Sequence, residues 1–431
     1  MIVSFSIQNF RSIREKVTLD FRATSDKHQE EYFVVEFPKP KLRVLKMAMI
    51  YGVNASGKTS LLNALEFLGY MVLYPLQDKN IELNIPQFAL DRDKPSLFEI
   101  DFIQRNVLYE YRLELDRSKV FYESLSYYPK GKRAEIFERK LDNNDLYGYK
   151  WSDKLFKKST RDYLELTIQN QAILAKIASI EDFSPLQDAH NWFRNKLQSL
   201  LRPNDNLLNF ANQFLINQPI NREAVKQYIL AFLNKADFWI NDIDIEEYDV
   251  DPSQVPEHLR NNLNPPFPNA KPSFKRYDFG FVHKLDEGSF TLDMAEESSG
   301  TRGFYGFGAI LMNLIFQEVV MPIDEIESSL HNDLLFHFIA MFLKNSKQGQ
   351  LIFTSHNTAL LNEKEIIRRD CVWITDRKAD GSTELTPVSD YPVRKEHSLA
   401  SLFKKGLIGG KPNLGSINLE DIDEQAQKTE N

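Results

Sequence analysis

The chain has 431 residues, and its 53 lysines and arginines against 61 aspartates and glutamates give a formal charge of −8. Hydrophobic residues make up 42% and charged residues 26%, which is ordinary for a globular protein and excludes collagen-like, disordered and disulfide-stapled chains. The single cysteine, Cys371, cannot form an internal disulfide and favours a reducing compartment. We expect a cytoplasmic protein without a signal peptide or membrane span, and the acidic balance disfavours nucleic-acid binding without excluding it.

The first 140 residues combine strand patterns with one glycine-rich loop. Apolar and polar residues alternate over 2–7 and 17–21, which predicts strands, and the continuous apolar run 45–51 is typical of a strand covered on both faces. Apolar residues at positions 61, 62, 65 and 68 predict a helix directly after the loop. Alternation over 97–140, broken by turn sequences, predicts an antiparallel meander.

The rest of the chain changes character twice. Residues 160–240 follow helical spacing without a sustained heptad, so a long coiled-coil arm is not expected, and a proline-rich connection follows over 251–273. The tail after Ile417 is acidic. From residue 274 the α/β pattern returns, with helices expected over 301–317 and 327–343 and strands over 319–323, 350–355 and 371–375.

The glycine-rich loop Gly52-Val-Asn-Ala-Ser-Gly57-Lys58-Thr59 has the spacing of a phosphate-binding loop. Glycines let successive backbone N–H groups face a phosphate, and the following helix adds the positive end of its dipole. Lys58 should reach the β- and γ-phosphates, and the Thr59 hydroxyl should bind Mg²⁺. A chance glycine-rich turn is the alternative, but the loop lies between a buried strand and an amphipathic helix, as this motif requires.

The apolar run Val319-Val-Met-Pro-Ile ends in Asp324 and Glu325. Beside the phosphate loop, Asp324 would hold Mg²⁺ through its water shell, and Glu325 would act as the general base for an attacking water. The alternative is an acidic helix start after an ordinary strand. Pro322 removes a hydrogen-bond donor from what should be a central strand, so we expect a local bulge there or pairing that begins only at Ile323.

Two further signals are weaker when each is taken alone. Ser298-Ser299-Gly300 precedes a helix, where hydroxyls, backbone N–H groups and the helix dipole can hold an anion, although an ordinary serine N-cap is the alternative. Because the chain already has one phosphate loop, the phosphate for this second site would come from a neighbouring copy. His356 ends an apolar strand, where it could contact the γ-phosphate or simply be a histidine at the edge of the core.

Taken in chain order, these four signals resemble those of the ATP-binding-cassette class, especially the SMC-like and RecF-like ATPases. Ile7-Gln-Asn-Phe-Arg-Ser12 and Asp324-Glu-Ile-Glu-Ser-Ser-Leu-His331 are also similar to segments of that group. Phe403-Lys-Lys-Gly-Leu-Ile-Gly-Gly-Lys-Pro412 resembles the C-terminal stretch of abortive-infection AAA-type ATPases from bacterial defence islands. The resemblance covers about 1–140 and 274–415.

The resemblance implies an α/β P-loop ATPase head with a mixed sheet, an antiparallel meander and an inserted helical subdomain. Residues 1–140 and 274–415 would form the two halves of the head, 141–273 the helical insert with its proline-rich connection, and 416–431 an acidic tail. ATP and Mg²⁺ are the implied cofactors, with Lys58, Glu325 and His356 catalytic and with Thr59, Asp324 and Gln87 on the metal. The implied nucleotide-binding residues are Gly52, Asn54, Ala55, Ser56, Gly57, Lys58, Thr59, Ser60, Ser298, Ser299 and Gly300.

The resemblance also implies head-to-tail assembly, in which the Ser298–Gly300 turn of one copy closes over ATP on the phosphate loop of another. A sensor or switch in anti-phage defence, controlling a partner effector such as a nuclease, is the function it favours. A nucleotide-gated oligomeric scaffold with slow hydrolysis and a RecF-like DNA repair ATPase are the alternatives.

Overall fold

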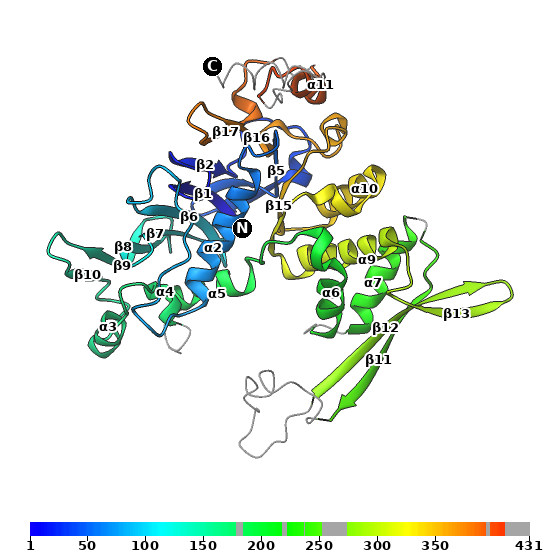
Figure 1. Ribbon diagram of the computed structural model, residues 1–431, viewed down its shortest axis with the longest axis horizontal. Helices are drawn as coiled ribbons and strands as arrows, with labels where there is room; N and C mark the ends of the chain where they lie inside the picture. The colour runs from blue at the N-terminus through cyan, green and yellow to red at the C-terminus, as the bar shows by residue number, and fades with distance from the viewer. Residues whose placement is uncertain (178–183, 218–221, 237, 252–273, 394–396, 410–431) are drawn as a thin grey trace, which may run out of the picture.

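The computed structural model describes residues 1–177, 184–217, 222–236, 238–251, 274–393 and 397–409. The predicted acidic tail and nearly all of the proline-rich connection lie outside the described residues. Within the described part of the chain, no helix is both long and apolar enough to span a membrane. Figure 1 shows two sheets side by side, a group of helices from the middle of the chain, and a narrow three-stranded sheet that extends away from the body.

One sheet has five strands in the order β14-β15-β5-β16-β17, of which only β17 is antiparallel to its neighbour. All six residues of β5 are buried, which explains the continuous apolar run, because a strand in this position is covered on both faces. The phosphate loop, Asp324 and His356 follow the carboxyl ends of β5, β14 and β15, which meet at one edge of the sheet. The strands are β5 Met47–Gly52, β14 Val320–Ile323, β15 Gln350–Thr354, β16 Val372–Arg377 and β17 Thr383–Pro387.

The expectation for Pro322 is wrong. β14 is the first strand of its sheet, and it pairs with β15 continuously from Val320 to Ile323, with Pro322 opposite Ile352. The backbone N–H groups of Val320 and Asp324 point to the other side, where they donate to the carbonyls of Lys196 and Leu201. Since alternate residues of a strand point the same way, the donor that proline lacks belongs to this outer side and is not needed by β15.

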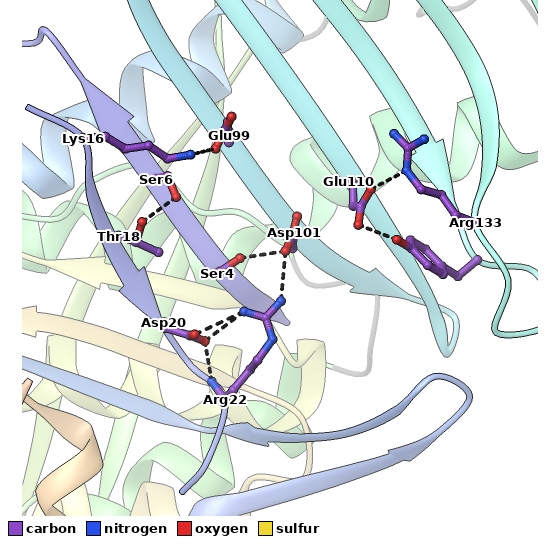
Figure 2. Close-up of polar contacts among 11 residues, drawn as sticks. Ser4, Ser6, Lys16, Thr18, Asp20, Arg22, Glu99, Asp101, Glu110 and Arg133 are labelled. Atoms are coloured by element: carbon purple, nitrogen blue, oxygen red, sulfur yellow. Dashed lines mark hydrogen bonds and ion pairs between the residues drawn. The ribbon is translucent and has the colours of Figure 1, made fainter. Parts of the chain in front are cut away.

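The other large sheet has seven strands in the order β10-β9-β8-β7-β6-β1-β2, and β6 to β9 form the predicted antiparallel meander. Its exposed face is polar beside β1 and β2, where Asp101 accepts hydrogen bonds from Ser4 and Arg22 (Figure 2). On its other face Phe102 stacks on Trp192, with ring centroids 4.3 Å apart. The strands are β1 Ile2–Gln8, β2 Val17–Asp20, β6 Ser96–Gln104, β7 Val107–Leu115, β8 Val120–Tyr127, β9 Ala134–Leu141 and β10 Tyr147–Trp151.

The helices carry the chain between these sheets. The predicted helix over 301–317 is α9, Ser299–Met312, continued by a π-helical turn over Asn313–Gln317, but the one over 327–343 is split. A 3-10 turn covers Ile326–Ser329, Leu330 is extended, and a new helix begins at Asn332 with His331 as its cap. The longer helices are α2 Lys58–Leu73, α3 Lys158–Glu165, α5 Ser184–Asn195, α6 Pro203–Ile216, α7 Arg222–Asn234, α9 Ser299–Met312 and α10 Asn332–Asn345.

Smaller elements complete the described structure. β11, β12 and β13 form a three-stranded sheet, whose last strand ends five residues before Ser298, and β3 and β4 form a two-stranded sheet. These strands are β3 Val34–Pro38, β4 Lys41–Leu45, β11 Asp242–Val250, β12 Phe274–Leu285 and β13 Gly288–Asp293. The short helices are α1 Glu30–Phe33, α4 Ile173–Lys176 and α11 Leu399–Lys404, with further 3-10 turns at Leu360–Asn362, Arg369–Cys371 and Val388–Asp390.

A buried glutamine joins the two large sheets. Gln350, the first residue of β15, is fully buried, and its amide oxygen accepts a hydrogen bond from the Ile2 backbone N–H at 2.7 Å. Its amide nitrogen donates to the carbonyls of Ile2 at 3.0 Å and Leu45 at 2.9 Å. One side chain therefore satisfies three backbone groups from β1 and β4 that have no access to water.

Replacing Gln350 by methionine keeps the volume but leaves these backbone groups without a partner. Each unsatisfied buried group costs about 1–3 kcal/mol, so we expect the free energy of unfolding to fall by about 3 kcal/mol or more. Urea denaturation followed by circular dichroism measures the change. The control, Gln348→Met on the partly exposed turn before the strand, should change it by less than about 0.5 kcal/mol. Equal effects of the two substitutions would contradict the role of Gln350.

Candidate nucleotide site

The phosphate loop connects β5 to α2 and has a conformation that its glycines make possible. Ala55 and Gly57 have positive φ angles of 60° and 102°, and Gly57 caps the amino end of α2. A Cβ atom on Gly57 would lie 2.0 Å from the Thr383 hydroxyl oxygen. Backbone conformation and the lack of space therefore both require glycine at this position.

Lys58 is buried at the start of α2 and turns back over the loop. Its ammonium donates to the carbonyls of Gly52 at 3.0 Å and Val53 at 3.1 Å. Burial lowers the pKa of Lys58 to about 8, and the nearby Asp324 and Glu325 carboxylates act in the opposite direction. The charge of this lysine is therefore poised to change close to neutral pH.

Asp324 links the loop to the two neighbouring strands. Its carboxylate Oδ1 accepts hydrogen bonds from the hydroxyls of Thr59 at 3.1 Å and Thr354 at 2.5 Å. Only 8% of Asp324 is exposed, so these hydroxyls compensate a carboxylate that is largely removed from water. Thr354 ends β15, and nothing in the sequence around it distinguishes it from any other strand residue.

Glu325 and His356 both line the cavity of the phosphate loop. Glu325 has a positive φ of 51°, its N–H donates to the Thr354 hydroxyl at 2.8 Å, and its side chain is about half exposed. The His356 Nε2 lies 3.9 Å from the Glu325 Oε1. Burial, and secondly the positive charge of Lys58, lowers the pKa of His356, so we treat it as a neutral imidazole near a carboxylate and not as an ion pair. The cavity has a volume of about 490 Å³ and is lined by Ser12, Asn54, Ala55, Ser56, Gly57, Lys58, Thr59, Ser60, Glu325 and His356.

Hydroxyl groups from segments far apart in the sequence also support this cavity. The Ser12 Oγ lies 2.8 Å from the Ser60 Oγ and 2.8 Å from the Thr383 Oγ1. Thr383 also donates to the Ser56 carbonyl at 2.9 Å. These contacts hold the turn after β1 and the start of β17 against the phosphate loop. Only the three-dimensional arrangement reveals them, since residues 12, 60 and 383 share no local motif.

The predicted Ser298–Gly300 turn lies elsewhere. Ser298 caps α9 by accepting the Thr301 N–H at 3.0 Å, and Ser299 and Gly300 line a separate cavity of about 580 Å³. The two cavities share no lining residue. A Cβ atom on Gly300 would meet only the Ser298 hydroxyl, at 3.8 Å, so its own chain leaves room for a larger residue.

Gln87 is not brought to the phosphate loop. Its amide nitrogen donates to the Lys94 carbonyl, its side chain is buried beside the turn at Asp91, and it does not line the cavity of the loop. One turn further along α2, Arg202 donates to the Asn63 Oδ1 at 3.0 Å, and like Gln87 it does not line the cavity.

The donor set at Thr59 and Asp324 suits magnesium. A hydroxyl and a carboxylate are hard oxygen ligands, and Mg²⁺ is typically bound by one or two carboxylates together with phosphates and water. Within the described ranges, no group of three or more histidine, cysteine, aspartate or glutamate residues could hold a metal without such help. The residues therefore fit a metal that arrives with a nucleotide better than one held by the protein alone.

The arrangement defines the class of the protein: an α/β fold with a phosphate loop at the carboxyl edge of a mostly parallel sheet. The model of the family described as "AAA domain, putative AbiEii toxin, Type IV TA system" matches residues 47–362, well over half of the chain, and the chain belongs to this family. The match extends from β5 to just beyond His356 and so contains every predicted site residue.

Solved structures offer more distant similarities. The SMC head domain from Thermotoga maritima has 11% identity and a TM-score of 0.39, over 90% of this chain and 98% of that one. An SmcHead bound to the C-winged helix domain of ScpA has 14% identity and a TM-score of 0.42, over 89% and 97%. No curated protein matches the sequence.

The pKa of Lys58 predicts how nucleotide binding depends on pH. A triphosphate needs the charged ammonium, which is the main form below a pH of about 8, half populated near that pH and lost above it. If only the charged form binds, the affinity for ATP should fall about tenfold between about pH 7 and about pH 9. Titration with a fluorescent ATP analogue measures this. Lys58→Ala should bind weakly at every pH, and a flat profile in the unmodified protein would contradict the prediction.

Proposed function

We propose that the protein is an ATPase that acts as a nucleotide-driven switch, with each site completed by a second copy of the chain. The observation that carries this proposal is the convergence of Lys58, the Thr59–Asp324 pair, Glu325 and His356 on one cavity. Membership of the AAA family supports it, because such families are typically nucleotide-binding ATPases.

Each residue of the cavity has a role in this proposal. The backbone N–H groups of the loop and the Lys58 ammonium would bind the β- and γ-phosphates, and Ser60 would support the loop beside them. Thr59 and Asp324 would hold Mg²⁺, which when bound neutralises charge that develops on the phosphates. The distance of 3.1 Å between their oxygens supports a shared ligand.

Glu325 would position the attacking water and accept its proton. It has a positive φ, its side chain lines the cavity and is about half exposed, and a carboxylate there is placed to accept a proton from water. His356 would contact the γ-phosphate as a neutral donor and report whether that phosphate is present. Hydrolysis would then change the contacts of His356, and this change is the switch.

The second copy would supply Ser298, Ser299 and Gly300. The separation of their cavity from that of the phosphate loop argues that one chain cannot close its own site. The α9 amino end, with its hydroxyls, would then meet the γ-phosphate bound to the neighbouring chain, which gives head-to-tail pairs or larger assemblies.

The biological role we propose is in bacterial anti-phage defence, where the switch would control an effector protein such as a nuclease. The family description "putative AbiEii toxin, Type IV TA system" and the C-terminal resemblance support this setting. In this proposal the chain itself would act through its conformation.

Glu325→Gln should retain ATP binding and lose turnover. The amide keeps the shape but cannot accept a proton, so kcat should fall about 100-fold or more with little change in KM. Phosphate release from the purified variant measures this, and Glu363→Gln, at an exposed glutamate outside the cavity, is the control. Turnover within about threefold of the unmodified protein would remove Glu325 from the mechanism.

Gly300→Val should leave folding intact and prevent ATP-dependent assembly. Because the chain itself leaves space at Gly300, we expect the melting temperature to change little, whereas ATP-dependent association should be lost if a neighbouring copy approaches there. Light scattering with ATP and Mg²⁺ measures the association. Ala295→Val, on the preceding turn but outside the cavity, is the control. Association that survives Gly300→Val, or that is also seen without nucleotide, would rule out this closure.

A further inference from the structure

One segment of the chain is linked to both members of the Thr59–Asp324 pair, to Asp324 directly and to Thr59 through Asn63. Residues 196–202, which we name the strap, run between α5 and α6 and form parallel bridges along the outer side of β14, at Leu197 with Val320 and at Leu201 with Ile323. The Leu201 carbonyl accepts the Asp324 backbone N–H at 2.9 Å. The strap therefore acts as an extra strand beside the one that ends in Asp324.

The next residue of the strap, Arg202, is linked through Asn63 to Thr59, the other member of the pair. The Arg202 Nη2 donates to the Asn63 Oδ1 at 3.0 Å, and the Asn63 Nδ2 donates to the Thr59 carbonyl at 2.8 Å. Asn63 is only 8% exposed, whereas Arg202 is exposed and is anchored through this contact. Consecutive residues, Leu201 and Arg202, are thus linked to the backbones of the two residues proposed to hold magnesium, Leu201 directly to Asp324 and Arg202 through Asn63 to Thr59.

Pro203 and Leu207, just after Arg202, line the cavity that Ser299 and Gly300 also line. Pro203 begins α6, which packs so closely on α9 that a Cβ atom on Gly306 would lie 2.2 Å from the Leu207 Cγ. The Tyr305 hydroxyl donates to the Asn212 Oδ1 at 3.0 Å, which fixes the two helices together. A displacement of the strap would therefore be passed to α9 with little loss, since close-packed helices move as one body.

We propose that Arg202 is a positioning residue that couples the Thr59–Asp324 pair to the helix carrying Ser298–Gly300 within the same chain. This inference rests on the proposed function and adds a route by which the state of one cavity sets the orientation of the other. In this proposal the helices before and after the strap transmit the effect of nucleotide binding to the surface that meets the second copy. Because the contact runs through a single hydrogen bond, it can be removed without deleting a core side chain.

The first test is a binding measurement. ATP affinity is measured with a fluorescent analogue, with Mg²⁺ and with a chelator, in Arg202→Ala, Asn63→Ala, the double variant and Arg202→Lys. We expect the gain in ATP affinity caused by Mg²⁺ to fall about tenfold in Arg202→Ala. The double variant should show no further loss, because both residues act through one contact. Arg202→Lys should recover part of the gain. In the presence of chelator, all variants should bind ATP as the unmodified protein does. The control is Arg194→Ala, at an exposed arginine on α5, and it should bind ATP normally with and without Mg²⁺.

The second test follows the transmission itself. Hydrogen exchange over 54–60 and 203–216 is compared with and without ATP and Mg²⁺ in a Ser298→Asp background, where the added carboxylate repels the triphosphate of a neighbouring copy. We expect ATP and Mg²⁺ to protect both segments from exchange. When Arg202→Ala is added, only the protection of 203–216 should be lost. Protection of 203–216 that is unaffected by Arg202→Ala would overturn the coupling and leave the proposed function standing. No protection of 54–60 in any form would overturn both.

Discussion

The carboxylate of Asp324 lies between two threonine hydroxyls that come from different elements, Thr59 at the start of α2 and Thr354 at the end of β15. A charge removed from water is tolerated only where such donors compensate it. The compensation depends on the register of β14, β15 and β5, because a shift of one residue would turn Thr354 away. The geometry of the site is therefore a property of the sheet and not of the loop alone.

The same dependence explains why distant parts of the chain converge here. Gln350 fixes the beginning of β15 against β1, and Thr354 at its other end meets Asp324. On the opposite side of β14 the strap holds the Asp324 backbone. The strand that carries the proposed metal ligand is thus held from both sides, once by its sheet neighbour and once by a segment that continues into α6.

Sequence reasoning could predict those features that depend on neighbouring residues. The phosphate loop, the meander and the strand leading to Asp324 each follow from spacing within a short window, and the structure confirms these elements. Thr354, Thr383 and Arg202 could not be predicted, because each acts on a partner that is between 30 and 327 positions away. Pro322 was misjudged because strand order decides its surroundings. The path of the chain places Gln87 beside Lys94 and away from the cavity of the phosphate loop.

The position of β5 has a consequence for biosynthesis. This strand is complete by residue 52, yet its two neighbours in the sheet, β15 and β16, are about 300 residues further along. Contacts between such distant segments form late, since a long loop must close before they are gained. A ribosome would have to translate beyond residue 370 before the central strand could pair with both neighbours. Shorter nascent chains would accordingly lack the assembled phosphate-loop cavity and would expose an apolar strand to chaperones and proteases.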